Sequence, residues 1–171
     1  MAGVSARIDV TTDEIGPVLR RLVDAGEDLT PAMDQIGGAM VSSTMDRFER
    51  EEGPDGRPWE KSARALADGG RTLTDRGNLV GFLTHRVLGD AVEWGSNLVY
   101  AAIHQLGGTI RAKAAKALAF RIGDAFVYVQ SVTLPARPYL GLDGDDEAEI
   151  LEILADHFAG AAPAPGGGGP R

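Results

Sequence analysis

Residues 30–52 have the sequence TPAMDQIGGAMVSSTMDRFEREE, which carries the clearest structural signature in the chain. Pro31 suits the first position of an α-helix, because its missing N–H would have no partner there. Five side chains then recur with helical spacing on one face: Met33, Ile36, Met40, Thr44 and Phe48. Gly53-Pro54 ends the pattern. We therefore expect a helix of roughly 22 residues, about 33 Å long, whose narrow apolar stripe suits packing across a sheet.

Two β-hairpins are predicted further along the chain. Gly89-Asp90 separates Thr84–Leu88 from Ala91–Trp94, and Gly123-Asp124 separates Ala117–Ile122 from Ala125–Val132. Glycine and aspartate are favoured in the tight turns that join antiparallel strands. The last of these segments also alternates with the two-residue period of a strand. Together the hairpins predict an antiparallel sheet of about four strands.

Helices are predicted on both sides of the hairpins. Thr12 is a candidate N-cap for a helix whose apolar spacing continues to Leu29. A last helix covers Asp145–Phe158, with acidic residues at its N-terminal end, where the helix dipole favours them. The fold class is therefore α+β: an antiparallel sheet of about four strands, built from two hairpins, packs against two long N-terminal helices and a C-terminal helix.

One domain is expected over residues 1–159, followed by a disordered glycine- and proline-rich tail over residues 160–171. Within the domain, residues 53–72 predict a loop, and short helices are expected from Thr74 to Leu83 and over Asn97–Leu106. The alanine- and lysine-rich segment Thr109–Lys116 predicts a mobile loop. Pro135 and Pro138 make the following segment extended and irregular.

Composition excludes several classes of protein. The 171 residues suit one domain with its own core. The chain has no cysteine, which excludes disulfides, thiolate metal sites and cysteine nucleophiles. No window approaches the roughly 20 apolar residues of a membrane span, and residues 1–10 lack the apolar core of a signal peptide. We therefore expect a soluble protein made in the cytoplasm.

No pattern of catalytic, cofactor-binding or metal-ligating residues emerges. His85, His104 and His157 are far apart without the spacing of metal ligands, and there is no nucleophile elbow, phosphate-binding loop or dinucleotide fingerprint. His104 lies just before Gly107-Gly108, where it is expected to end a helix. Asp145 and Asp146 are interpreted as caps on a solvated helix start. A hydrolase with an unrecognised site around His104 remains an alternative.

The charge distribution bears on nucleic acids. The net charge of −8 would repel a phosphate backbone unless basic residues cluster. One modest cluster spans Arg111–Arg121, with Phe120 as its one aromatic residue. We expect no specific nucleic-acid binding, but a nucleic-acid-binding regulator that uses this segment is an alternative function.

Four segments resemble a known family. In chain order they are Phe48 with Pro54-Asp55-Gly56 and Pro58-Trp59; Thr74–Leu79; Val92–Ser96 followed by YAAIHQLGG at 100–108; and LPARPYLGL at 134–142. This series is similar to the segments of phage virion morphogenesis proteins, the tail-completion or head–tail-joining family of Mu-like and related tailed phages. The pair YAAIHQLGG and PARPYLGL is the most specific part. The alanine- and lysine-rich segment and the C-terminal tail lie outside the likeness.

The resemblance implies a structural protein, not an enzyme, in the neck or tail end of the virion. It would act in tail completion and head–tail joining as one copy of a ring, with six copies matching tail symmetry. The implied partners are further copies of itself, the tail tube or terminator and the head connector, with no membrane and no cofactor. DNA could pass through the ring. A tail terminator that caps the tail tube is the nearest alternative.

Four residues are candidates for interfaces between subunits: Trp59, His104, Arg137 and Tyr139. Tryptophan, tyrosine and arginine are enriched at interface hot spots, and the proline-rich segment that holds Arg137 and Tyr139 cannot be a central strand. For each residue the alternative is packing within its own subunit: Trp59 under its loop, Tyr139 on the core, and Arg137 paired with an acid.

Overall fold

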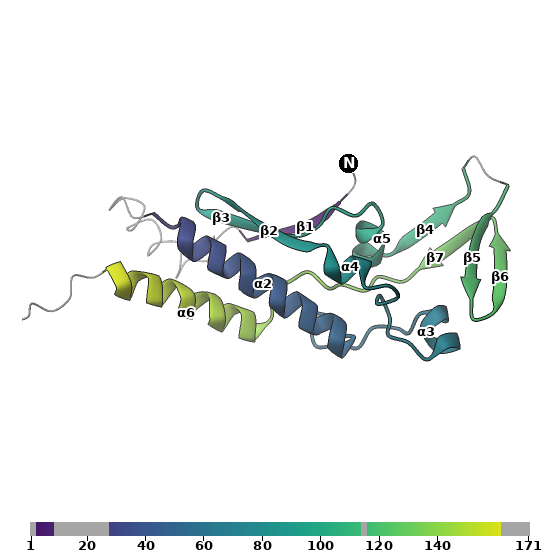
Figure 1. Ribbon diagram of the computed structural model, residues 1–171, viewed down its shortest axis with the longest axis horizontal. Coiled ribbons are helices and arrows are strands. Elements are labelled where there is room, and N and C mark those ends of the chain that lie inside the picture. The colour runs from purple at the N-terminus through teal and green to yellow at the C-terminus, as the bar shows by residue number, and fades with distance from the viewer. Residues whose placement is uncertain (1–2, 9–27, 114–115, 162–171) are drawn as a thin grey trace, which may run out of the picture.

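The computed structural model describes residues 3–8, 28–113 and 116–161 (Figure 1). In chain order the elements are β1 (Val4–Ile8), α2 (Thr30–Arg50), α3 (Ala63–Asp68), α4 (Asn78–Gly81), β2 (Leu83–Leu88), β3 (Ala91–Ser96), α5 (Ala101–Leu106), β4 (Gly108–Arg111), β5 (Leu118–Ile122), β6 (Ala125–Val129), β7 (Ser131–Leu134) and α6 (Gly144–Ala161). Mixed α+β architecture is confirmed, with a long helix near the N-terminus and another at the C-terminus.

Helix α2 forms where the sequence predicts it. Pro31 lies in its first turn, and Glu51 caps its C-terminus in the left-handed conformation (φ 57°). The predicted stripe is buried along its whole length. Arginines in the last turn lie where the dipole favours cations. No helix of the described residues is long and apolar enough to cross a membrane.

The body of the molecule has three layers (Figure 1). Strands β1, β3 and β2 form an antiparallel sheet with β3 in the centre. Helix α2 crosses this sheet, and α6 packs against α2. A Cβ at Gly37 would stand 2.3 Å from Cδ2 of His85, so glycine permits the close crossing of α2 over β2. The core between the layers joins Met33, Ile36 and Met40 to Val92, Trp94, Ile150 and Leu154.

A second region, residues 108–134, projects from one end of the body, and we call it the arm (Figure 1). It contains two separate two-stranded antiparallel sheets, β4–β7 and β5–β6. None of its described residues belongs to the hydrophobic core. The tip of the β5–β6 hairpin lies against α3, since a Cβ at Gly123 would be 3.7 Å from Cβ of Ala67.

Both predicted hairpins form, but the prediction that they make one four-stranded sheet is wrong. The first hairpin, β2–β3, gains its third strand from β1, and the second, β5–β6, stands alone in the arm. The chain leaves the body at Gly107 and Gly108, whose positive φ angles of 69° and 141° turn it away from the first sheet. The sequence thus located the hairpins but not their partners.

Other differences concern shorter elements. Strand β4 lies in the segment expected as a mobile loop, and helix α3 lies in the predicted loop 53–72. The C-terminal helix, predicted over Asp145–Phe158, spans Gly144–Ala161. The predicted helix from Thr12 lies outside the described residues except for its last two positions, and so does the tail beyond residue 161.

Candidate interface site

The segment 135–142, PARPYLGL, runs extended between the arm and α6, and side chains of other elements bind its backbone. The amide oxygen of Gln105 accepts hydrogen bonds from the backbone N–H groups of Tyr139 (2.9 Å) and Leu140 (3.0 Å), and its Nε2 donates to Leu140 O (3.0 Å). The backbone N–H of Arg137 donates to His104 O (2.8 Å). Residues of α5 therefore form the hydrogen bonds that a neighbouring strand would otherwise form, and they pair backbone groups of the segment that would be left without partners.

An aromatic cluster packs the segment onto α2. The ring of Phe48 lies 5.4 Å from that of Trp59 and 5.2 Å from that of Tyr139. Trp59 Nε1 donates to Pro138 O (2.9 Å), and the Tyr139 hydroxyl donates to Ala101 O (3.2 Å). Burial raises the pKa of Tyr139 to about 12, so its hydroxyl remains a donor at neutral pH.

Arg47 fixes the other end of the segment. Its guanidinium, buried in the body, donates to the carbonyls of Tyr139 (3.3 Å) and Gly141 (2.8 Å). It also pairs with Asp143 (2.9 Å) and with the buried carboxylate of Asp146. Burial alone would raise the pKa of Asp143, but hydrogen bonds from the Asp146 backbone and from Arg47 lower it below its ordinary value.

Sequence reasoning missed Arg47 and predicted the capping role of Asp146 but not its burial. The Asp146 carboxylate accepts a hydrogen bond from the Asp143 backbone N–H (2.9 Å) at the start of α6, and it also forms a buried ion pair with Arg47 of α2. One feature of the sequence could have indicated this ion pair: Arg47 falls on the apolar face of α2, three residues after Thr44 and beside Phe48. A charged residue on a buried helix face requires a partner of opposite charge.

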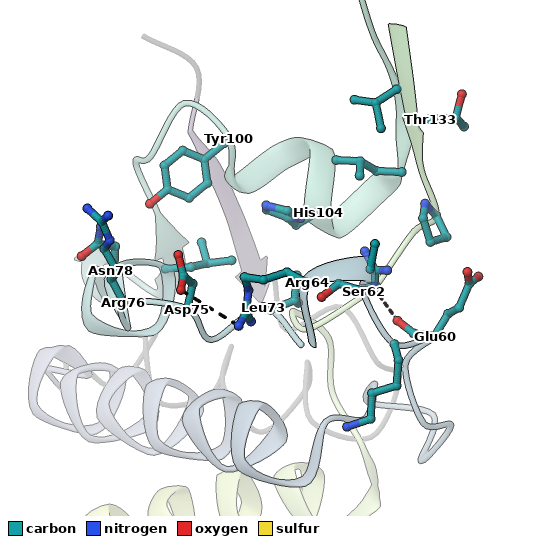
Figure 2. Close-up of a pocket in the computed structure, with 17 residues that line it drawn as sticks. Glu60, Ser62, Arg64, Leu73, Asp75, Arg76, Asn78, Tyr100, His104 and Thr133 are labelled. Carbon is teal, nitrogen blue, oxygen red and sulfur yellow. Dashed lines mark hydrogen bonds and ion pairs between the residues drawn. The ribbon is translucent and has the colours of Figure 1, made fainter. Parts of the chain in front are cut away.

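A groove of about 510 Å³ opens where the extended segment leaves the arm (Figure 2). Tyr100, at the N-cap of α5, and His104, within that helix, form one side, and residues from α3, α4 and their connecting loop form the other. The lining contains four cationic side chains, Lys61, Arg64, Arg76 and Arg137, and two carboxylates, Glu60 and Asp75. Arg64 lies 4.0 Å from Asp75, and Arg137 Nε donates to the backbone oxygen of Glu60 (2.7 Å). The lining therefore holds more cationic than anionic side chains.

His104 lines the groove as a neutral imidazole. Burial, reinforced by the positive charge of Arg137, lowers its pKa, so the imidazole is neutral at pH 7. Its Nδ1 is buried and has no hydrogen-bond partner among the described residues. Among all the residues that the structure describes, no three His, Cys, Asp or Glu side chains come close enough together to hold a metal ion.

The four interface candidates fall into two pairs. Trp59 and Tyr139 meet around Phe48 in the core, with 7% and 0% of their surface exposed. His104 and Arg137 lie in the wall of the groove, and Arg137 is only 3% exposed. Within the subunit, Trp59 and Tyr139 pack on the core, whereas Arg137 donates to the backbone oxygen of Glu60 and forms no ion pair with an acid among the described residues.

The profile of the Phage virion morphogenesis family matches residues 10–159 of this chain. The chain belongs to this family. It is 35% identical over 145 residues to "Mu-like prophage FluMu G protein 2" of Haemophilus influenzae, covering 85% of this chain and 89% of that protein. It is 32% identical over 168 residues to the protein named "Putative capsid assembly protein G" of Escherichia phage Mu, covering 91% and 90%. No solved structure matches the chain significantly.

Three of the four segments that resemble the family lie together in the structure. YAAIHQLGG supplies Gln105 and His104, PARPYLGL supplies the backbone they bind, and the PDG loop with Trp59 covers its other side. A Cβ at Gly107 would stand 2.6 Å from the Ala136 backbone nitrogen, and one at Gly141 would stand 2.7 Å from Cγ of Pro54. The family pattern therefore encodes one packed unit of a virion morphogenesis protein.

Proposed function

We propose that this chain is a structural protein of the phage neck or tail end, which completes the tail and joins it to the head as a subunit of a ring. The ring would contain six copies, matching the symmetry of the tail. Its partners would be other copies of the chain, the tail tube or its terminator, and the head connector. In this role the protein needs no cofactor and catalyses no reaction.

One observation carries the proposal: side chains of the segments that resemble the family bind the chain's own backbone, while large apolar side chains remain exposed elsewhere. Val99, just before α5, and Leu106, its last residue, are 75% and 73% exposed. Phe126 and Tyr128 in the arm are 70% and 68% exposed. Exposed apolar groups gathered in patches mark surfaces that bind other proteins. An assembly subunit requires such surfaces, whereas an enzyme requires converging reactive groups.

The groove offers the most direct place for a partner of different sequence. Arg64 and Arg76 on one side face Tyr100 and His104 on the other (Figure 2). An extended peptide carrying carboxylates could lie between them, with its apolar side chains against Tyr100 and Leu134. Arginine and tyrosine are among the residues that contribute most at such interfaces.

Loss of the gene tests the proposal and separates it from its alternatives. In cells that produce phage without this chain, electron microscopy should show filled heads and tails of normal length that are not joined. Restoring the gene should restore joined particles. Tails of abnormal length would indicate a terminator instead. A general fall in the amounts of all phage proteins would indicate a regulator and would contradict a structural role.

A variant of the groove sharpens the test. Arg76 is exposed on the groove wall, so Arg76→Glu should leave the fold intact and reverse the charge that a partner meets. We expect unjoined heads and tails with this variant. Arg57→Glu is the matched control, since the Arg57 side chain is 86% exposed on a loop outside the groove. Equal particle yields from both variants would exclude the groove as a partner site.

A further inference from the structure

The arm has strands but no interior. The β5–β6 hairpin has only two strands, and an isolated two-stranded hairpin is marginally stable in water. Its Leu118, Phe120, Val127 and Val129 are only partly buried. The tip gains some support from α3, but no described residue of the arm is part of the core. A second surface is needed to cover it.

The outer face of the hairpin has a definite chemistry. The register pairs Ala119 with Tyr128 and Arg121 with Phe126, so these four residues share one face. All four are exposed. The face therefore combines two large aromatic rings, one small residue and one cation, and aromatic residues and arginine are enriched at protein interfaces.

The arm is also the basic region of an acidic protein. Residues 108–134 contain four basic residues, Arg111, Lys113, Lys116 and Arg121, and one acidic residue, Asp124, a net charge of +3 in a chain of net charge −8. All four basic side chains are exposed. Arg121 pairs with Asp124 at 2.7 Å, an exposed pair that contributes little to stability.

Helix α6 presents the complementary surface. Asp145, Glu149, Glu152 and Asp156 follow one another at intervals of four, three and four residues, so they form one ridge along the helix. All four are exposed, and α6 contains no lysine or arginine. Beside the ridge lie Ala148, Leu151 and Ala155, also exposed, which leave a shallow apolar strip for flat rings.

We propose that the arm of one copy of this chain docks on the outer face of α6 of a second copy. Phe126 and Tyr128 would cover Ala148, Leu151 and Ala155, while the basic residues of the arm would pair with the acidic ridge. The two surfaces lie towards opposite ends of one subunit, so they meet only between subunits (Figure 1). This contact rests on the proposed function, and it specifies which surfaces build the ring.

Charge supports a second copy of the chain as the partner. The contact joins two different patches, so it can repeat from copy to copy until a ring closes. Contacts of arm with arm, or of α6 with α6, would bring like charges together, which is unfavourable at an interface. Charge therefore favours contacts between the arm of one copy and α6 of another.

Cross-linking between engineered cysteines tests the contact in particles, because the chain has no native cysteine. Ala119→Cys and Ala148→Cys both replace exposed alanines on the two faces. In virions carrying the double variant, a short bis-maleimide should give a ladder of linked copies that ends at the ring size. Each single variant should give no ladder. The control pair is Ala119→Cys with Thr84→Cys, which places the second cysteine at an exposed position of strand β2. This pair should give no ladder.

The outcomes separate this contact from the proposed function. If the chain is present in virions but only the control pair forms a ladder, or neither pair does, the contact is wrong and the neck role stands. If the chain is absent from virions and from all assembly intermediates, the proposed function fails and the contact fails with it. Protection of the arm by DNA, shown by cross-links of Lys113 to the genome, would also overturn the contact.

Charge exchange gives a second, independent readout. Arg111→Glu with Lys113→Glu should lower the yield of joined particles at least about tenfold, since like charges would meet at the interface. Glu149→Lys with Glu152→Lys should do the same. Combining all four changes should restore the yield, because the charges are opposite again. Failure of the combination to recover, with each protein folded, would contradict direct pairing.

Discussion

The body and the arm use their apolar residues in opposite ways. In the body, Phe48, Trp59 and Tyr139 are buried around one another and their polar atoms are bonded to backbone carbonyls. In the arm, Phe126 and Tyr128 point into solvent from a hairpin without a core. Burial of a large aromatic side chain stabilises a fold by roughly 1.5–3 kcal/mol. The aromatic side chains of the body contribute this stabilisation, and the exposed ones of the arm do not. The body is therefore stabilised by its own core, whereas in the proposed contact the arm is covered by a second copy of the chain.

Removal of Arg47 should have the largest effect on the body. Arg47→Ala leaves the buried carboxylate of Asp146 without its partner and frees the Gly141 carbonyl. Breaking a buried ion pair in this way costs about 3–5 kcal/mol, which denaturant unfolding would measure. The control is Arg50→Ala in the same turn, whose side chain is 52% exposed. A similarly small loss for both variants would mean that Arg47 does not join α2 to α6.

A matched pair of phenylalanines compares the two regions directly. Phe48→Ala should lower the free energy of unfolding by about 3–5 kcal/mol, because it opens a cavity beside Trp59 and Tyr139. Phe126→Ala should change it by less than about 0.5 kcal/mol, since that ring is already exposed. Chemical denaturation of both variants is the measurement. Equal losses would refute the division into a self-sufficient body and a coreless arm.

Two tyrosines give a smaller contrast. Tyr139→Phe removes the hydroxyl that donates to Ala101 O in the buried body, and the unpaired carbonyl should cost roughly 1–3 kcal/mol. Tyr128→Phe removes an exposed hydroxyl and should leave the unfolding midpoint unchanged. If Tyr128→Phe lowered stability as much as Tyr139→Phe does, the arm would be packed in the free subunit.

The smallest expected effect is a dependence of stability on pH at the junction of body and arm. Burial lowers the pKa of His104 from its ordinary value of 6.5, so below about pH 6.5 the unfolded chain binds a proton more readily than the folded one. Stability should therefore fall as pH decreases from 6.5 towards the folded pKa. His104→Gln should flatten this part of the profile of unfolding free energy against pH. An unchanged slope would show that His104 is not buried in solution.

The sequence predicted those parts of the fold that local pattern determines. The spacing on α2, the acidic start of α6 and the two glycine-aspartate turns each specify an element through neighbours within a few residues. Pairing between strands far apart in the sequence has no such local pattern. Strand β1 pairs with β3 across about ninety residues, and β4 pairs with β7 across the inserted hairpin. The predicted single sheet was wrong for this reason.

The sequence indicated which residues to consider at the candidate site, but not how they are arranged in space. Trp59, His104, Arg137 and Tyr139 were found by residue type and by family pattern, and the structure gathers them into two pairs. Gln105, which binds three backbone groups of the extended segment, was part of the pattern but had no assigned role. A side chain that replaces a strand partner is recognisable only when the strand's unpaired backbone is seen in three dimensions.

A cryo-electron microscopy reconstruction of the neck of the intact virion tests the account most directly. We expect a ring of this chain between head and tail, with β5–β6 of each copy lying along α6 of the next. A neck without this chain, or a ring in which every β5–β6 hairpin is surrounded by solvent, would contradict it.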